Sequence, residues 1–194
     1  MSINFINLLV GIILTFLVGI TIDIFIYFDL DKDFVTFAVL ISVNIILLYV
    51  YPEKFTLNNI WAYVFPAMTL ALIYYYISYT IYGTNISITN SYGVLGFFIY
   101  FINISVLIPL YEEIIVRKLI FISGKKYIGM PASAIITSLI FAMTHDSMFV
   151  WAFILSIVLC VMTDSGINVY KRSIFHGSYN LTFSLILLRS ANII

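Results

Sequence analysis

The sequence has few charged residues and almost no cysteine. Lysine, arginine, aspartate and glutamate make up 9% of its 194 residues, whereas about a quarter of the residues in soluble domains are charged. This scarcity excludes a soluble globular domain, and a hydrophobic content of 63% indicates an integral membrane protein. The single cysteine, Cys160, excludes an intramolecular disulfide; because it lies in an apolar run, we expect it to serve in packing.

Three short signals are also missing. The N-terminus lacks the basic region and small-residue cleavage site of a secretory signal, so we expect the first apolar segment to be retained as an anchor. The C-terminal residues form no prenylation box, so we do not expect the chain itself to be a lipidated substrate. No HExxH sequence is present, which removes the usual signature of a zinc protease.

Long apolar runs dominate the sequence instead. They lack the period-2 alternation of barrel strands, and a helix needs about 20 residues to cross the hydrocarbon of a bilayer. We therefore predict an all-α fold, a polytopic transmembrane bundle of about seven helices that forms a single domain over residues 1–194. The predicted helices cover approximately residues 3–28, 34–51, 60–82, 94–122, 131–145, 148–163 and 173–190.

The basic residues are distributed unequally between the two sides of this predicted bundle. Lys32 and Arg189 fall on one side, and the other side collects Lys54, Arg117, Lys118, Lys125, Lys126, Lys171 and Arg172. Positively charged residues in short loops stay in the cytoplasm. We therefore predict a multi-pass protein of the cell membrane with a cytoplasmic N-terminus and an external C-terminus.

The fourth apolar run contains two adjacent glutamates. Glu113 and Arg117 are four residues apart and can pair on one helix face, whereas Glu112 is turned about 100° away and faces something else. Pro109 precedes them and is predicted to kink the helix, as irregular backbone does beside polar cavities in membranes. A buried ion pair that holds the bundle together would explain Glu113 and Arg117, but it would leave Glu112 unexplained.

Two further pairs with helical spacing follow in later apolar runs. Phe141 and His145 share one helix face, and His176 and Asn180 share another. Each pair alone has a structural explanation, as a helix end or as a polar packing contact. Counting 1.5 Å per residue from the predicted cytoplasmic helix ends gives different depths, from about 6 Å for His176 to about 21 Å for His145. The spacing alone therefore does not bring these residues together.

Taken together, these side chains can fill every role in the hydrolysis of a peptide bond. Glu112, helped by neutral His145, would take a proton from a water molecule that attacks the amide carbonyl. His176 and Asn180 would bind the resulting oxyanion. Ionisable residues are costly in a membrane and mark functional sites by default.

The three motifs in this order resemble those of a known family. They read EExxxR at Glu112–Arg117, FxxxH at Phe141–His145 and HxxxN at His176–Asn180. They are similar to those of the CAAX protease and bacteriocin-processing (CPBP, Abi/Rce1-like) family of intramembrane glutamic endopeptidases, over residues 109–181. The resemblance implies a metal-independent protease without a cofactor, with Glu112 and His145 activating water and with His176 and Asn180 in the oxyanion hole. Glu113, Arg117 and Phe141 would be supporting residues.

The resemblance also indicates partners. It implies a substrate that is a membrane-associated or secreted peptide or protein precursor, and a link to bacteriocin maturation or self-immunity. We expect contact with membrane lipid, allow for a partner membrane protein, and expect no nucleic acid.

Three alternatives remain open at this point. Glu112, His145 and His176 form an adequate zinc ligand set. A non-catalytic immunity or scaffold protein could use the same residues only to stabilise its fold. A proton-coupled transporter would also bury glutamate and histidine, but the sequence lacks two similar halves with interrupted helices.

Overall fold

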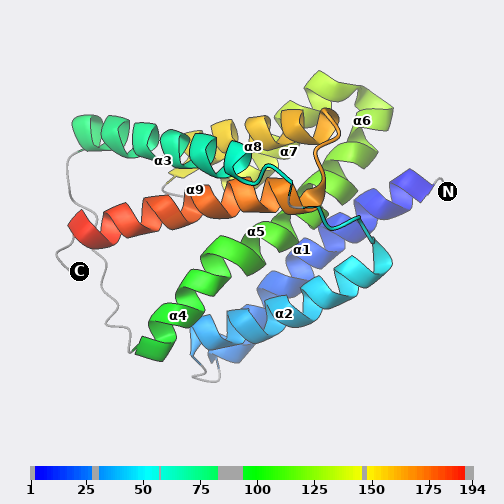
Figure 1. The fold of residues 1–194 in the computed structure, drawn as a ribbon. Coiled ribbons are helices and arrows are strands. Elements are labelled where there is room, and N and C mark those ends of the chain that lie inside the picture. The colour runs from blue at the N-terminus through cyan, green and yellow to red at the C-terminus, as the bar shows by residue number, and fades with distance from the viewer. Residues whose placement is uncertain (1–2, 28–30, 57, 83–93, 146–147, 191–194) are drawn as a thin grey trace.

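Helices make up most of the structure, which is a computed structural model that describes residues 3–27, 31–56, 58–82, 94–145 and 148–190. Three helices come first: α1 (Ile3–Tyr27), α2 (Lys32–Val50) and α3 (Trp61–Tyr82). A long rod follows, formed without a break by α4 (Val94–Ile102), η1 (Asn103–Leu107), α5 (Ile108–Glu112), η2 (Glu113–Phe121) and α6 (Ile122–Ile128). The last helices are α7 (Met130–Met143), α8 (Phe149–Asp164) and α9 (Val169–Ser190). The described residues thus form seven helical rods, which confirms the predicted all-α class (Figure 1).

Several of these helices have the length and hydropathy of membrane spans. Within the described residues, three stretches are long and apolar enough to cross a bilayer: Lys32–Val50, Trp61–Thr80 and Leu95–Ile128. Three shorter apolar helices accompany them: Leu9–Ile24, Met130–Met143 and Phe149–Asp164. The chain is a multi-pass membrane protein.

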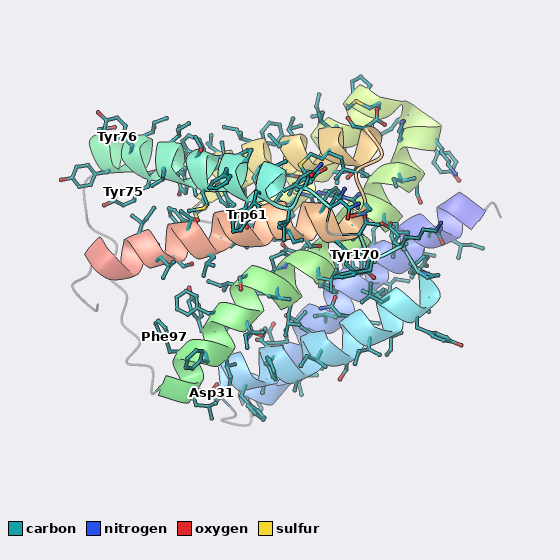
Figure 2. All side chains as sticks on the ribbon, in the orientation of Figure 1. Asp31, Trp61, Tyr75, Tyr76, Phe97 and Tyr170 are labelled. Carbon is teal, nitrogen blue, oxygen red and sulfur yellow. The ribbon has the colours of Figure 1, made fainter. Side chains whose placement is uncertain are left out.

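Large apolar side chains cover the outside of the bundle as well as its core. Phe16 and Phe65, for example, are exposed, as suits a surface that faces lipid. Figure 2 shows aromatic side chains near both ends of the bundle, with Tyr75 and Tyr76 at one end and Tyr170 toward the other. Aromatic rings at both ends match the aromatic belts of membrane proteins at the water interface.

The described part of the bundle has two main apolar cores. One lies between α1, α2 and the rod and includes Leu40, Ile115 and Leu119, and the other lies between α3, α8 and α9 and includes Leu159 and Phe175. Figure 1 shows that the rod runs obliquely past α9. The long rod contributes to the first core and α9 to the second, so each core fixes one of the segments that carry the sequence motifs.

Two glycines of α1, Gly11 and Gly19, differ in their surroundings. A Cβ atom added to Gly11 would lie 3.0 Å from side-chain atoms of Leu119 and Ile120, so glycine lets α1 pack closely on η2. At Gly19, a Cβ would meet nothing within 4 Å. Cys160 is buried beside Phe121, and this confirms its predicted packing role.

The long rod is not a regular α-helix. Its π-helical segments η1 and η2 lie on either side of α5, which contains Pro109. In η1 the Ile108 N–H donates to the carbonyl of Asn103, five residues back, so the Ile104 carbonyl loses its α-helical donor. Pro109 has no N–H and cannot donate to the Ser105 carbonyl. The predicted irregularity at Pro109 therefore takes the form of π-helical turns.

Polar contacts join the long rod to the stretch that follows α2 and to α8, and join that stretch to α9. Lys118 of η2 forms an ion pair of 2.9 Å with Glu53, which follows α2, and Lys125 of α6 pairs with Asp164 at the end of α8. The Glu53 carboxylate also accepts a hydrogen bond of 2.8 Å from the Val169 N–H at the start of α9. Burial raises the pKa of Glu53, but the Val169 and Lys118 contacts outweigh this effect and hold the pKa below its ordinary value of 4.5.

Candidate active site

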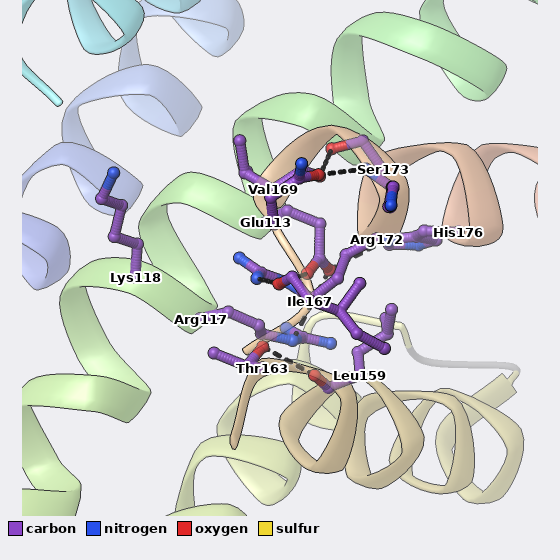
Figure 3. Close-up of polar contacts among 12 residues, drawn as sticks. Glu113, Arg117, Lys118, Leu159, Thr163, Ile167, Val169, Arg172, Ser173 and His176 are labelled. Carbon is purple, nitrogen blue, oxygen red and sulfur yellow. Dashed lines mark hydrogen bonds and ion pairs between the residues drawn. The ribbon is translucent and has the colours of Figure 1, made fainter. Parts of the chain in front are cut away.

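Glu113 lies at the centre of a buried cluster of charged side chains (Figure 3). Its Oε1 atom is 3.6 Å from Nε of Arg117, and both side chains are fully buried. This contact confirms the predicted pairing. The Arg117 guanidinium also lies over the Phe141 ring, 4.6 Å from its centroid. Its three nitrogens form no hydrogen bond within the described part of the chain, so ionic and cation–π attraction hold it in place.

Arg172 is a member of this cluster that the sequence analysis missed. Its Nε donates a hydrogen bond of 3.0 Å to Oε2 of Glu113, and its Nη1 donates to the carbonyl of Ile167. The residue is only 3% exposed. The charge pattern predicts that Arg172 is a cytoplasmic loop cation, but α9 already begins at Val169. The clue in the sequence was the spacing of Arg172, His176 and Asn180, which puts all three on one face of a helix.

This finding changes the basis of the predicted membrane orientation. Arg117 and Arg172 are both buried in the cluster, so neither is a loop charge. The prediction of a cytoplasmic N-terminus then rests on the lysines of that side, namely Lys54, Lys118, Lys125, Lys126 and Lys171.

His176 lies between the two glutamates. Its Nε2 is 3.6 Å from Oε2 of Glu112, and its Nδ1 is 3.5 Å from Oε1 of Glu113. The sequence analysis expected Glu112 to face a different direction from Glu113. The backbone at both glutamates is α-helical, with φ −66° and ψ −37° at Glu112 and φ −66° and ψ −32° at Glu113. The two side chains therefore leave the helix in different directions, and they reach one imidazole because each contacts a different ring nitrogen.

The two carboxylates differ in access. The Glu113 side chain is fully buried, whereas the Glu112 side chain is 16% exposed. One oxygen of Glu112, Oε2, is buried without a hydrogen-bond partner among the described residues. Glu112 is therefore the less enclosed of the two carboxylates. Glu113 is held by its contacts with Arg117 and Arg172.

The depths counted from the sequence did not bring the candidate residues together, but the structure places His176 beside Glu112. Two features account for the difference. First, α9 begins at Val169, earlier than the predicted residue 173, which places His176 deeper in the bundle. Second, the long rod passes α9 obliquely (Figure 1), so equal counts from helix ends do not give equal depths.

Phe141 connects the second histidine to this cluster. Its ring centroid is 4.4 Å from that of His145 and 5.9 Å from that of His176. The Nδ1 atom of His145 lies 2.9 Å from the Phe141 carbonyl oxygen. A carbonyl oxygen can only accept, so Nδ1 carries the hydrogen, and Nε2 is the proton acceptor of the neutral ring. The imidazole that contacts Glu112 is that of His176, and the His145 ring contacts Phe141.

Asn180 lies one turn beyond His176 in α9 and contacts the backbone of the rod. Its Nδ2 donates a hydrogen bond of 3.1 Å to the carbonyl of Ile104, the group that lost its α-helical donor in η1. A second asparagine amide, that of Asn44, donates to the Leu107 carbonyl at 3.0 Å. Two asparagine amides thus hold this part of the rod, and the second hydrogen of the Asn180 amide has no acceptor among the described residues.

Gly177 permits the close approach of α9 to η1. A Cβ atom at this position would lie 1.9 Å from the carbonyl oxygen of Ser105, far inside any allowed contact. Glycine therefore sets how near His176 and Asn180 come to the long rod.

A groove of about 400 Å³ lies elsewhere, between α1 and α2. Its two hydroxyls, of Thr21 and Ser42, donate to the carbonyls of Leu17 and Ala38 in their own helices. The groove therefore presents apolar surface and does not include the charged cluster. Within the described residues, no group of three histidine, cysteine, aspartate or glutamate side chains is arranged to hold a metal ion, so the suggested zinc ligand set is not assembled.

Part of the chain matches a known protein family. A family model described as "Type II CAAX prenyl endopeptidase Rce1-like" matches residues 94–182. This stretch runs from α4 into α9, makes up just under half of the chain and contains all three motifs. No curated protein and no solved structure matches the chain.

Proposed function

Residues 94–182 form an Rce1-like domain of the type II CAAX prenyl endopeptidase (CPBP/Abi) family, and from this premise we propose that the protein is an intramembrane, metal-independent endopeptidase. The substrate would be a membrane-associated or secreted peptide or protein precursor. The observation that carries the proposal is the position of His176 between Glu112 and Glu113 inside a membrane helix bundle. One of these carboxylates is accessible and the other is neutralised by two arginines.

Glu112 is the general base in this proposal. Its carboxylate takes a proton from a water molecule while the water oxygen attacks the carbonyl carbon of the scissile amide. The C–O bond forms and the carbonyl becomes a tetrahedral oxyanion. Glu112 then returns the proton to the amide nitrogen as the C–N bond breaks, which releases a carboxylic acid and an amine. His145 assists through Nε2, the acceptor left by the contact of its Nδ1 with the Phe141 carbonyl.

His176 and Asn180 stabilise the oxyanion. They lie on one face of α9, and the Asn180 amide has one hydrogen to spare beyond its bond to Ile104. Each oxyanion donor is worth about 10²- to 10³-fold in rate. Glu113 and Arg117 support the site from within the buried cluster.

The test is cleavage by purified protein in detergent. We expect a library of fluorogenic peptides to be cleaved by wild type in the presence of a metal chelator. Glu112→Gln should lower kcat by about 10²- to 10⁴-fold, the range for loss of a general base. Asp164→Asn is the matched control, because Asp164 is a carboxylate at the end of α8 that pairs with Lys125, and it should retain the wild-type rate.

Two results would contradict the proposal. Cleavage abolished by the chelator would indicate a metal enzyme. A folded Glu112→Gln protein with wild-type cleavage would remove Glu112 from the mechanism, and if it also kept its biological effect, a non-catalytic immunity or scaffold role would be favoured.

A further inference from the structure

Arg172 occupies a position that neither its helix nor its surroundings favour. It lies in the first turn of α9, where the helix dipole disfavours a cation, and it is 3% exposed. Burying a guanidinium is costly unless it is paired and hydrogen-bonded. The contacts of Arg172 within the cluster must therefore account for its placement.

Arg172 supplies the hydrogen bond that orients the Glu113 carboxylate. Its Nε donates to Oε2 of Glu113 at 3.0 Å, while Oε1 of Glu113 accepts no hydrogen bond within the described residues. Arg117 is an ion-pair partner at 3.6 Å, and its nitrogens make no hydrogen bond there. Arg172 is itself fixed at a second point, because its Nη1 donates to the carbonyl of Ile167 before α9 (Figure 3).

The orientation of the Glu113 carboxylate determines which of its two oxygens faces His176. With Oε2 held by Arg172, Oε1 points to Nδ1 of His176 at 3.5 Å. An ionised carboxylate at one imidazole nitrogen fixes the ring orientation, keeps hydrogen on that nitrogen and stabilises the imidazolium. The opposite nitrogen, Nε2, then faces Glu112 at 3.6 Å. Contacts of this length in a free enzyme commonly shorten when substrate binds.

We propose that Arg172 is a positioning residue: it holds Glu113 so that Glu113 fixes the His176 imidazole with Nδ1 inward and Nε2 toward Glu112. The inference rests on the proposed protease function for its catalytic consequence. It adds a residue outside the three motifs and gives Glu113 a specific task. Arg172 acts through Glu113 and does not itself touch the substrate.

A double-mutant cycle tests the route of this effect. Arg172→Gln and Glu113→Gln should each lower kcat by about 10- to 100-fold, the range for residues that orient a ligand or base, with little change in KM. The double variant should be no slower than the slower single variant, because both changes break one chain of contacts. Independent effects that multiply in the double variant would overturn the proposal.

A spectroscopic measurement tests the positioning without relying on cleavage. The chain has only two histidines, so ¹⁵N-histidine labelling in a His145→Gln background reports on His176 alone. We expect a protected Nδ1 proton on His176 that is lost or strongly shifted in Arg172→Gln. Arg172→Lys provides a second variant in case glutamine prevents folding, since lysine keeps the charge but not the two-point hydrogen bonding of arginine.

Lys118→Gln is the matched control. Lys118 lies on the same rod as Glu113, but its ion-pair partner is Glu53. The variant therefore removes a cation without changing the contacts of Glu113, and the Nδ1 proton signal of His176 should not shift. An unchanged His176 signal in both Arg172 variants would overturn the inference. If the signal moves as expected but wild type cleaves no peptide, the positioning by Arg172 stands and the proposed protease function fails.

Discussion

Replacing Gly177 by alanine tests whether the close approach of α9 to η1 assembles the site. A Cβ atom at this position would lie 1.9 Å from the carbonyl oxygen and 2.9 Å from the carbonyl carbon of Ser105. Both are backbone atoms of a continuous rod, so no change of rotamer relieves the clash. Ordinary contact begins near 3.4 Å, which requires α9 to move away from η1 by about 1.5 Å.

The cost to stability follows from three effects. Overpacking in a close-packed interior costs about 1 to 3 kcal/mol. Separation also weakens the hydrogen bond from Asn180 to the Ile104 carbonyl, worth about 0.5 to 1.5 kcal/mol. Alanine is a better helix former than glycine by about 1 kcal/mol, which offsets part of this loss. We expect the free energy of unfolding to fall by about 1 to 3 kcal/mol.

The cost to activity should be larger. His176 precedes Gly177 directly, so a shift of α9 moves its imidazole away from Glu112, which is 3.6 Å distant in wild type. Misplacement of a catalytic group by about 1 Å lowers rates by about 100-fold. Gly177→Ala should therefore lose most of its cleavage activity at temperatures where it remains folded.

Thermal unfolding in detergent and initial cleavage rates measure the two effects. Gly19→Ala is the matched control, because a Cβ there meets nothing within 4 Å; it should unfold at or above the wild-type temperature and cleave normally. A Gly177→Ala protein that unfolds and cleaves like wild type would refute the reasoning, since α9 would then not depend on glycine to reach the rod.

Two further substitutions test the surroundings of the site. Glu53 has a pKa held below 4.5, so its contribution to stability is present above about pH 4.5 and is lost as the pH falls through its folded pKa. Glu53→Gln should lower the free energy of unfolding by about 1 kcal/mol at pH 7. On acidification the variant should lose less stability than wild type, which unfolding midpoints at pH 7 and pH 4 measure. Equal acid sensitivity of the two proteins would contradict this prediction. Phe141→Leu removes the ring beneath the Arg117 guanidinium and should cost about 1 to 3 kcal/mol and reduce cleavage. Phe98→Leu, at a side chain that is 61% exposed, should change neither property, and equal effects in both variants would argue against the ring contacts.

The helices and the pairing within one helix could be predicted from the sequence because both depend on local pattern. Apolar runs of sufficient length marked the seven rods, and the four-residue spacing of Glu113 and Arg117 predicted their contact. The start of α9 could not be predicted this way. Residues 169–172 read as a polar loop, and the carboxylate that accepts the Val169 N–H comes from Glu53, far away in the chain.

The burial of Arg172 was missed for a similar physical reason. A cation beside a loop is ordinarily solvated, and only a distant anion makes its burial tolerable. That anion is Glu113, which is 59 residues away. The π-helical turns were not predicted either, since the Ile104 carbonyl that η1 releases needs a donor from another helix. The Asn180 amide provides this donor, and the Asn44 amide adds a contact to the Leu107 carbonyl, through tertiary contacts that no local spacing encodes.

The buried charges are better explained by chemistry than by stability. Taking ions out of water costs several kcal/mol each, and apolar replacements of buried ion pairs are often neutral or stabilising. Here the nitrogens of Arg117 form no hydrogen bond within the described residues, so its pairing with Glu113 is far from the geometry that would recover the cost of burial. The cluster is nevertheless suited to moving a proton. Two arginines surround the Glu113 carboxylate, and the His176 imidazole joins Glu113 to the partly exposed Glu112 carboxylate. The apolar cores of the bundle supply the stability that lets such a cluster persist in the membrane.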